Sequence, residues 1–201
     1  IATLVTWHHF ERYGPLWSLA DPDPGLLAVW VQECRWAIQV FFIISGYVLA
    51  LSMSPRVWTL GKAGRYVVRR YVRLGFPYLA AIGLAVAAAA MARGTLSNEA
   101  IGSPPTVDQL LAHALFLQDI LRYESLSAGL WFVAIEFQLG LMYLAILLLR
   151  DALTPLCRID ADDLSLLLGW PLALVSLFYF NVDEQYDAWG IYFFAQFFTG
   201  V

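Results

Sequence analysis

The run from Leu130 to Leu149 is the feature that most restricts how this chain can fold. Its only strongly polar side chains are those of Glu136 and Gln138. About 20 apolar residues in a helix match the thickness of the hydrocarbon core of a bilayer. Because the bilayer core offers no water to the backbone, a single apolar run must satisfy its amides and carbonyls internally, as a helix does. The run therefore predicts a membrane-spanning helix.

The composition extends this prediction to the whole chain. Hydrophobic residues make up 60% of the 201 residues and charged residues 14%, whereas soluble domains carry about 25% charged residues. The aromatic content of 15% suits the interfacial belts of membrane proteins. The net charge of −4 does not suggest a nucleic-acid partner. We predict an all-α, polytopic transmembrane helical bundle that forms one domain over residues 1–201.

Six further apolar segments bring the expected number to about seven. They are residues 1–10, 36–53, 74–92, 107–121, 164–180 and 188–201. Segment 107–121 carries Asp108, His113 and Asp119, so it is expected to be tilted, short or partly interfacial. The first and last segments are too short to cross a bilayer. We therefore expect the chain to be part of a larger protein, truncated at both ends.

The segment 54–73 contains half of the twelve basic residues and no acidic residue. The positive-inside rule predicts that this segment is a cytoplasmic loop, and a loop that binds lipid headgroups would have the same composition. The direction of the span at 130–149 then depends on segment 107–121. If that segment crosses the membrane, Glu136 lies near the inner half of its span. If it does not cross, the placement is reversed.

Glu136 is the strongest pointer to function. An ionisable side chain inside an apolar span costs a few kcal/mol or more and is by default a candidate for function. The alternative is a carboxylate that fixes helix packing through an interhelical hydrogen bond. Gly140 lies one turn further on the same face and would let another helix approach the carboxylate.

Two histidines end the first apolar segment, His8 and His9. An imidazole can take up and return a proton near neutral pH, so either is a candidate general base. The alternative is a pair of interfacial histidines at the end of a helix. A metal site is not expected, because no third ligand accompanies the pair at helical spacing.

Arg69, Arg70 and Arg73 stand at the end of the basic segment. A guanidinium fork binds phosphate bidentately and is permanently charged, so these arginines are candidates for binding a phosphate-bearing ligand. The alternative is a simple basic anchor beside a span. Ser45 and Gly46 form a small pair inside the second span. We assign them to close helix packing, since no base accompanies the serine hydroxyl.

Four stretches together resemble the acyltransferase-3 family of integral-membrane O-acyltransferases. They are the histidine-ended segment 4–10, Phe-Phe-Ile-Ile-Ser-Gly-Tyr-Val-Leu at 41–49, Arg-Tyr-Val-Arg-Leu-Gly-Phe-Pro-Tyr at 70–78 and Leu-Trp-Phe-Val-Ala-Ile-Glu-Phe-Gln at 130–138. They occur in the order of the family and cover roughly residues 1–150. The resemblance implies a bundle of about ten spans, of which this chain would hold the first two thirds.

The resemblance also implies a reaction and its residues. The histidine of the family falls on His9, with His8 as the second choice, and the family's glutamate falls on Glu136. The Arg-x-x-Arg pair falls on Arg70 and Arg73, with Arg69 beside them. The implied donor is acyl-CoA, most simply acetyl-CoA, without a metal. The implied acceptor is a hydroxyl of a saccharide or of a lipid-linked molecule, at the bacterial inner membrane.

Two other functions remain open. A transporter or flippase of a lipid-linked glycan would also place Glu, Arg and His along a path through the membrane. The paired, broken helices that many transporters show in repeated halves are not evident here. A non-catalytic membrane scaffold would tolerate neutral replacements of Glu136 and of the arginine pair.

Overall fold

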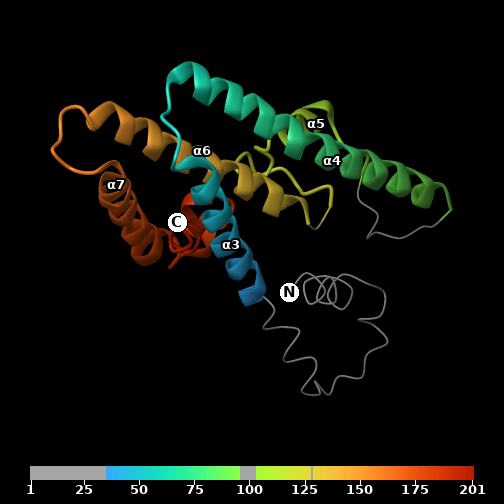
Figure 1. Cartoon of the computed structure of the whole chain (residues 1–201). Coiled ribbons are helices and arrows are strands. Elements are labelled where there is room, and N and C mark those ends of the chain that lie inside the picture. The colour runs from blue at the N-terminus through green and yellow to red at the C-terminus, as the bar shows by residue number, and fades with distance from the viewer. Residues whose placement is uncertain (1–34, 96–102, 128) are drawn as a thin grey trace.

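The computed structural model describes residues 35–95, 103–127 and 129–201, and these residues form helices and connections without a strand (Figure 1). The α-helices are α3 (Arg35–Met53), α4 (Leu60–Thr95), α5 (Val107–Ala114), α6 (Leu130–Leu153), α7 (Ala161–Val175) and α8 (Phe194–Phe198). A π-helical turn, η2 (Ser176–Phe180), continues α7. Two short 3₁₀ turns, η3 (Glu184–Tyr186) and η4 (Gly190–Phe193), precede α8.

Within the described ranges the all-α class is confirmed, and three helical segments there are long and apolar enough to cross a membrane. These are Leu60–Gly94, Leu130–Leu153 and Ala161–Phe180. A shorter apolar helix covers Ile38–Met53. The predicted number of about seven segments is not confirmed among the described residues. The expected segment at 1–10 lies outside them, and the segment at 188–201 consists of short turns and the five residues of α8.

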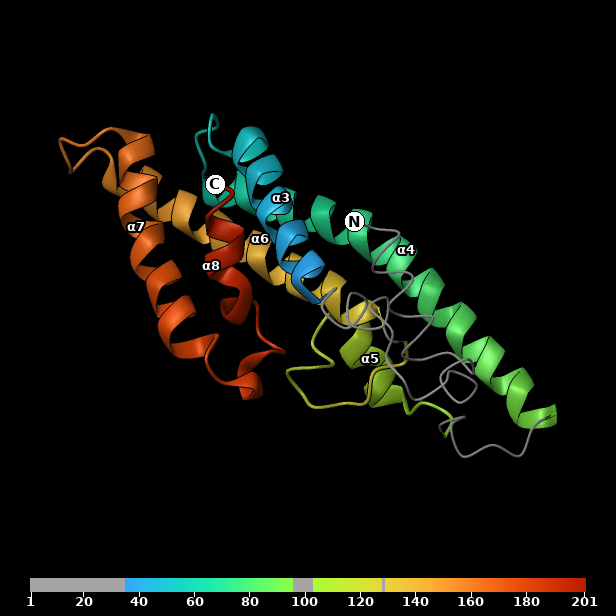
Figure 2. The ribbon, with the colours of Figure 1, turned by 90° about the horizontal axis from the view of Figure 1, so that it is seen from below.

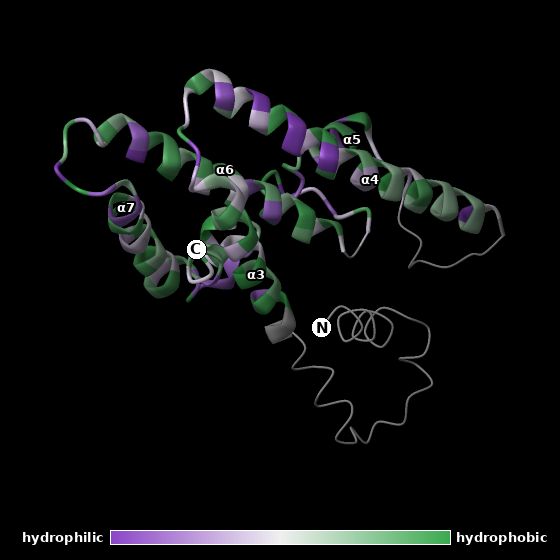
Figure 3. Ribbon diagram, viewed as in Figure 1, coloured by the Kyte–Doolittle hydropathy of each residue, from purple (hydrophilic) through white to green (hydrophobic). Residues whose placement is uncertain are grey.

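The predicted division into a basic loop at 54–73 and a separate span at 74–92 is wrong. One helix of 36 residues, α4, covers most of both and continues through Pro77. The charge of residues 62–73 suggested a loop, but this stretch contains no Pro, Asn, Asp or Ser that would favour a turn. Figure 3 shows hydrophilic residues along the first part of α4 and mostly hydrophobic ones further along.

The helix α5 is short, as one of the alternatives for segment 107–121 required. Its eight residues rise by about 12 Å, far less than the ~30 Å of a bilayer core. Thr106 caps it by accepting the N–H of Gln109. His113 is buried and ties α5 to the next connection, because Nε2 accepts the N–H of Leu126 and Nδ1 donates to the carbonyl of Gln109.

The direction of α6 follows from its contacts. Near its C-terminal end, Arg150 donates to the carbonyls of Ser54 and Arg56 in the α3–α4 connection, at 3.0 and 2.9 Å. The end of α6 therefore lies beside that connection, which we name the basic end of the bundle. Glu136, six residues after the start of α6, lies toward the opposite end. Of the two placements that the sequence left open, the described residues favour the one in which segment 107–121 does not cross.

The core combines aliphatic and aromatic side chains, and α8 lies between α3 and α7 (Figure 2). Phe42 of α3 stacks against Phe132 of α6 and packs against Phe193 of η4, each with ring centroids 4.9 Å apart. At Gly46 the backbone of α3 approaches the carbonyl of Phe197 so closely that no side chain would fit. The prediction that the Ser45–Gly46 pair allows close helix packing is thus confirmed for the glycine.

Candidate functional site

A buried ion pair joins α4 to α6. Arg70 Nη2 lies 2.8 Å from Glu136 Oε1, and the two side chains are 2% and 15% exposed. The same nitrogen donates to the backbone carbonyl of Glu136, also at 2.8 Å. The guanidinium therefore binds both the carboxylate and the helix that carries it. Taking two charges out of water costs several kcal/mol per ion unless geometry and further hydrogen bonds compensate.

Two hydroxyl groups extend the ion pair. Ser45 Oγ, from α3, donates to Glu136 Oε1 at 2.5 Å, and Arg70 Nη1 donates to Tyr66 Oη at 3.3 Å. Three helices thus meet at one carboxylate. The sequence alone predicts a packing role for Ser45 and does not predict this contact with Glu136. The signal was a hydroxyl in an otherwise apolar stretch of helix, where it needs a polar partner.

Gly140 makes room for this arrangement, as the sequence predicted. A Cβ atom at this position would lie 2.6 Å from Arg70 Nε and 2.7 Å from Arg70 Cζ. The face of α6 one turn after Glu136 is therefore occupied by the guanidinium of the neighbouring helix.

Replacing Gly140 by alanine is expected to push the Arg70 guanidinium away from Glu136. The backbone need not move, because the clash is with the far end of a flexible side chain. The free energy of unfolding should fall by about 1.5–3 kcal/mol for each charged hydrogen bond that is broken. The measurement is reversible unfolding of the variant in mixed detergent micelles. The matched control is Gly83→Ala in α4, where an added Cβ meets nothing within 4 Å. Equal stability of the two variants would contradict this role of Gly140.

The ion pair is incompletely satisfied. Glu136 Oε2 and Arg70 Nε are buried and have no hydrogen-bond partner among the described residues. Buried polar atoms in native proteins nearly always have partners, and an unmade bond costs about 1–3 kcal/mol. One acceptor and one donor of the pair are thus left without a hydrogen-bond partner by the described residues.

A second buried arginine, Arg150, makes only structural contacts and can be compared with Arg70. Arg150 is 2% exposed. Its Nε binds Asp151 at 2.7 Å and its other two nitrogens bind backbone carbonyls. Asp151 in turn accepts the backbone N–H of Trp58. Every group of this cluster has a partner, and the cluster holds the α3–α4 connection against α6. The Arg70–Glu136 pair differs from this cluster, because one of its donors and one of its acceptors have no partner among the described residues.

The other predicted arginines do not join Arg70. Arg69 lines a separate cavity, and Arg73 is exposed and forms no ion pair within the described ranges. Successive residues of a helix are rotated by about 100°, so Arg69 and Arg70 face different directions. The three guanidinium groups therefore do not form one cluster.

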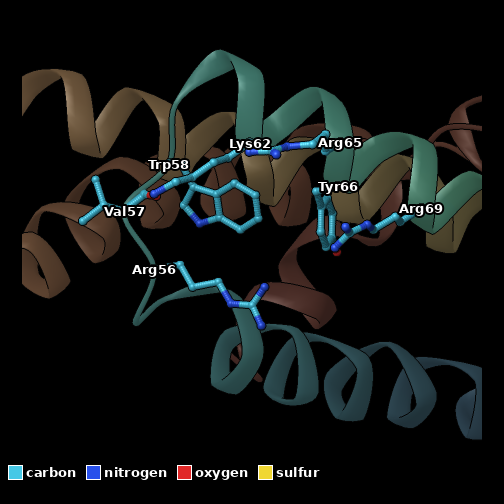
Figure 4. A pocket seen from close by; sticks show the side chains of 7 residues that line it. All are labelled: Arg56, Val57, Trp58, Lys62, Arg65, Tyr66 and Arg69. Atoms are coloured by element: carbon cyan, nitrogen blue, oxygen red, sulfur yellow. The ribbon is translucent and has the colours of Figure 1, made fainter.

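The cavity beside Arg69, which we name the basic cavity, has a volume of about 580 Å³ (Figure 4). It lies at the basic end of the bundle and contains four cationic side chains and two aromatic rings. Its lining residues are Arg56, Val57, Trp58, Lys62, Arg65, Tyr66 and Arg69. Tyr66 belongs to both places, because its ring lines the cavity and its hydroxyl accepts from Arg70.

A second cavity, of about 970 Å³, opens near the start of α6 and has a different lining. Aromatic side chains such as Trp131 and Tyr192 stand beside carboxylates that include Asp119 and Glu124. Burial is the main cause that raises the pKa of the Asp119 carboxyl above its ordinary value, although the hydrogen bond from Gln118 opposes this shift. The two cavities therefore lie toward opposite ends of α6 and differ in charge.

The remaining predicted site residues, His8 and His9, lie outside the described residues. Within the ranges that the structure describes, no group of three or more His, Cys, Asp or Glu side chains is placed to hold a metal ion. The groups that the structure brings together are thus Glu136, Arg70 and Ser45, with Tyr66 at their edge.

Comparisons with known proteins do not assign this chain to a family. No family model, no curated protein and no solved structure matches this chain. The resemblance to the acyltransferase-3 family therefore stays a prediction that rests on the four sequence stretches.

Proposed function

We propose that this chain belongs to a membrane O-acyltransferase that moves an acyl group, most simply acetyl, from acyl-CoA to a hydroxyl group. The acceptor would be a saccharide or a lipid-linked molecule at the bacterial inner membrane. The observation that supports this most is the Arg70–Glu136 pair, which is buried between apolar helices and has one open acceptor and one open donor.

The open atoms suit the groups that acyl transfer must position. Glu136 Oε2 can accept the hydrogen bond of an acceptor hydroxyl, which orients its oxygen. Arg70 Nε can donate to a carbonyl oxygen on which negative charge develops. In the reaction the hydroxyl oxygen attacks the thioester carbon, a C–O bond forms and the C–S bond breaks. The proton of the hydroxyl would pass to the imidazole of His9, or of His8, and then to the leaving thiolate.

The two cavities suit two different substrates. The basic cavity carries only positive charge among its described lining residues, which suits the phosphates of coenzyme A. The second cavity combines aromatic faces with three carboxylates and one arginine, Arg122, and this excess of negative charge suits a polyhydroxylated acceptor and not a phosphate-rich donor. A scaffold would need neither cavity.

Replacing Glu136 by glutamine is expected to lower acyl transfer by about 10² or more, the low end of what a positioned catalytic group contributes. The carboxamide keeps the size of the side chain but removes its charge. The measurement is thiol release from acetyl-CoA and transfer of labelled acetyl, with the full-length protein in native membranes. Asp163→Asn, an exposed change at the start of α7, is the matched control. Near-normal transfer by Glu136→Gln, or no thiol release by the unchanged protein, would refute the proposal.

A further inference from the structure

Four cations surround the basic cavity without a carboxylate among its described lining residues. Arg56 comes from the α3–α4 connection, and Lys62, Arg65 and Arg69 come from the first turns of α4 (Figure 4). None of the three arginines forms an ion pair within the described part of the chain. Like charges gathered around one cavity repel each other, so this lining is complementary to an anion with more than one charge.

The cavity has a fixed aromatic wall beside its four exposed cations. Its aromatic wall is held in place, since Trp58 is buried and its indole N–H donates to the carbonyl of Met53 at 3.0 Å. The ring of Tyr66 meets Trp58 edge to face, with centroids 5.3 Å apart. Lys62 is exposed, and its Nζ donates to the carbonyl of Val57 at 3.0 Å. The volume of about 580 Å³ lies in the range of small-molecule pockets. An anchor for membrane orientation needs charge alone and not such a cavity.

We propose that the basic cavity binds a ligand that carries at least two phosphate groups. Guanidinium forks bind phosphate bidentately and Lys62 supplies a point charge, so the four cations can hold two phosphates. The source is either a free nucleotide or a lipid headgroup, which share this chemistry. The phosphate site does not depend on the proposed function. Only the further identification of the ligand as the nucleotide end of acyl-CoA rests on acyl transfer.

The test uses the full-length protein in nanodiscs of phosphatidylcholine. The soluble probe is adenosine 3′,5′-bisphosphate, whose binding is measured by calorimetry. In a second arm, native mass spectrometry measures how strongly cardiolipin, whose headgroup carries two phosphates, is retained relative to phosphatidylcholine. The test variant is Arg65→Gln combined with Arg69→Gln. The control is Arg158→Gln, an exposed residue of the loop after α6 that lies toward the same end and does not line the cavity.

We expect the double variant to bind the preferred probe at least a hundredfold more weakly, about tenfold for each cation removed, and Arg158→Gln to bind as the unchanged protein does. Loss of the bisphosphate would assign the site to a free nucleotide. Loss of retained cardiolipin would assign it to a lipid headgroup. The proposal is overturned if neither probe binds, or if the double variant and the control bind alike.

Acyl transfer is measured on the same preparations, so that the two proposals can fail separately. Binding of the bisphosphate that depends on Arg65 and Arg69, without acyl transfer by the unchanged protein, would remove the proposed function and leave the phosphate site. Acyl transfer that is equal in the double variant and the control, with no probe bound, would remove the phosphate site alone.

Discussion

Replacing Arg70 by methionine is expected to lower the free energy of unfolding by about 3–5 kcal/mol. The methionine fills much of the space of the arginine stem but leaves the carboxylate of Glu136 buried without a cation, and removing one member of a buried pair has costs of this size. The measurement is reversible unfolding in mixed detergent micelles. Arg158→Met, a replacement of an exposed arginine, should change stability by less than about 0.5 kcal/mol.

Combining Arg70→Met with Glu136→Leu separates packing from function. A buried ion pair replaced as a whole by apolar residues is often neutral or stabilising, so the double variant should recover most of the stability that Arg70→Met loses. Acyl transfer should nevertheless be absent from it. Recovery of both stability and transfer would show that the pair serves only to hold α4 against α6. A double variant as unstable as Arg70→Met would contradict the energetic argument itself.

The sequence predicts where two of the long helices begin but not where the third begins. Apolar runs place the starts of α3 and α6 within one residue of those observed. The sequence predicts the start of α4 at Leu74, fourteen residues after the observed start at Leu60. The basic charge there indicates a loop, yet lysine and arginine are good helix formers, so a basic stretch can also be the first part of a long helix.

Only part of the candidate site can be predicted from the sequence. A carboxylate in an apolar run is conspicuous, and Gly140 on the same face indicated a close neighbour. Ser45 and Glu136 are 91 positions apart, so no local pattern could join them. Arg69, Arg70 and Arg73 looked equivalent as charges. Which of them faces α6 depends on how α4 is rotated, and packing against Gly140 decides this in favour of Arg70.

Replacing Gly46 by alanine is expected to cost about 3 kcal/mol or more of unfolding free energy, at the upper end of the range for overpacking. The added Cβ would lie 1.9 Å from the carbonyl oxygen of Phe197, a backbone atom that cannot rotate away. Gly200 makes the reciprocal close approach to α3, because a Cβ on Gly200 would lie 1.9 Å from the carbonyl oxygen of Ile43. The helix α3 and the C-terminal segment must therefore move apart for a side chain to fit at either glycine.

Gly83→Ala is the matched control for this prediction. Its added Cβ meets nothing within 4 Å, and removing a glycine from a helix interior stabilises by up to about 1 kcal/mol. The two variants add the same methyl group, so opposite changes in the midpoint of thermal unfolding would isolate the crossing at Gly46. Gly46 also follows Ser45 directly. If α3 moves outward, Ser45 Oγ leaves Glu136, and acyl transfer should fall even under conditions in which the variant stays folded. Equal stability of the two variants would mean that α3 and α8 do not cross as closely as the structure has them.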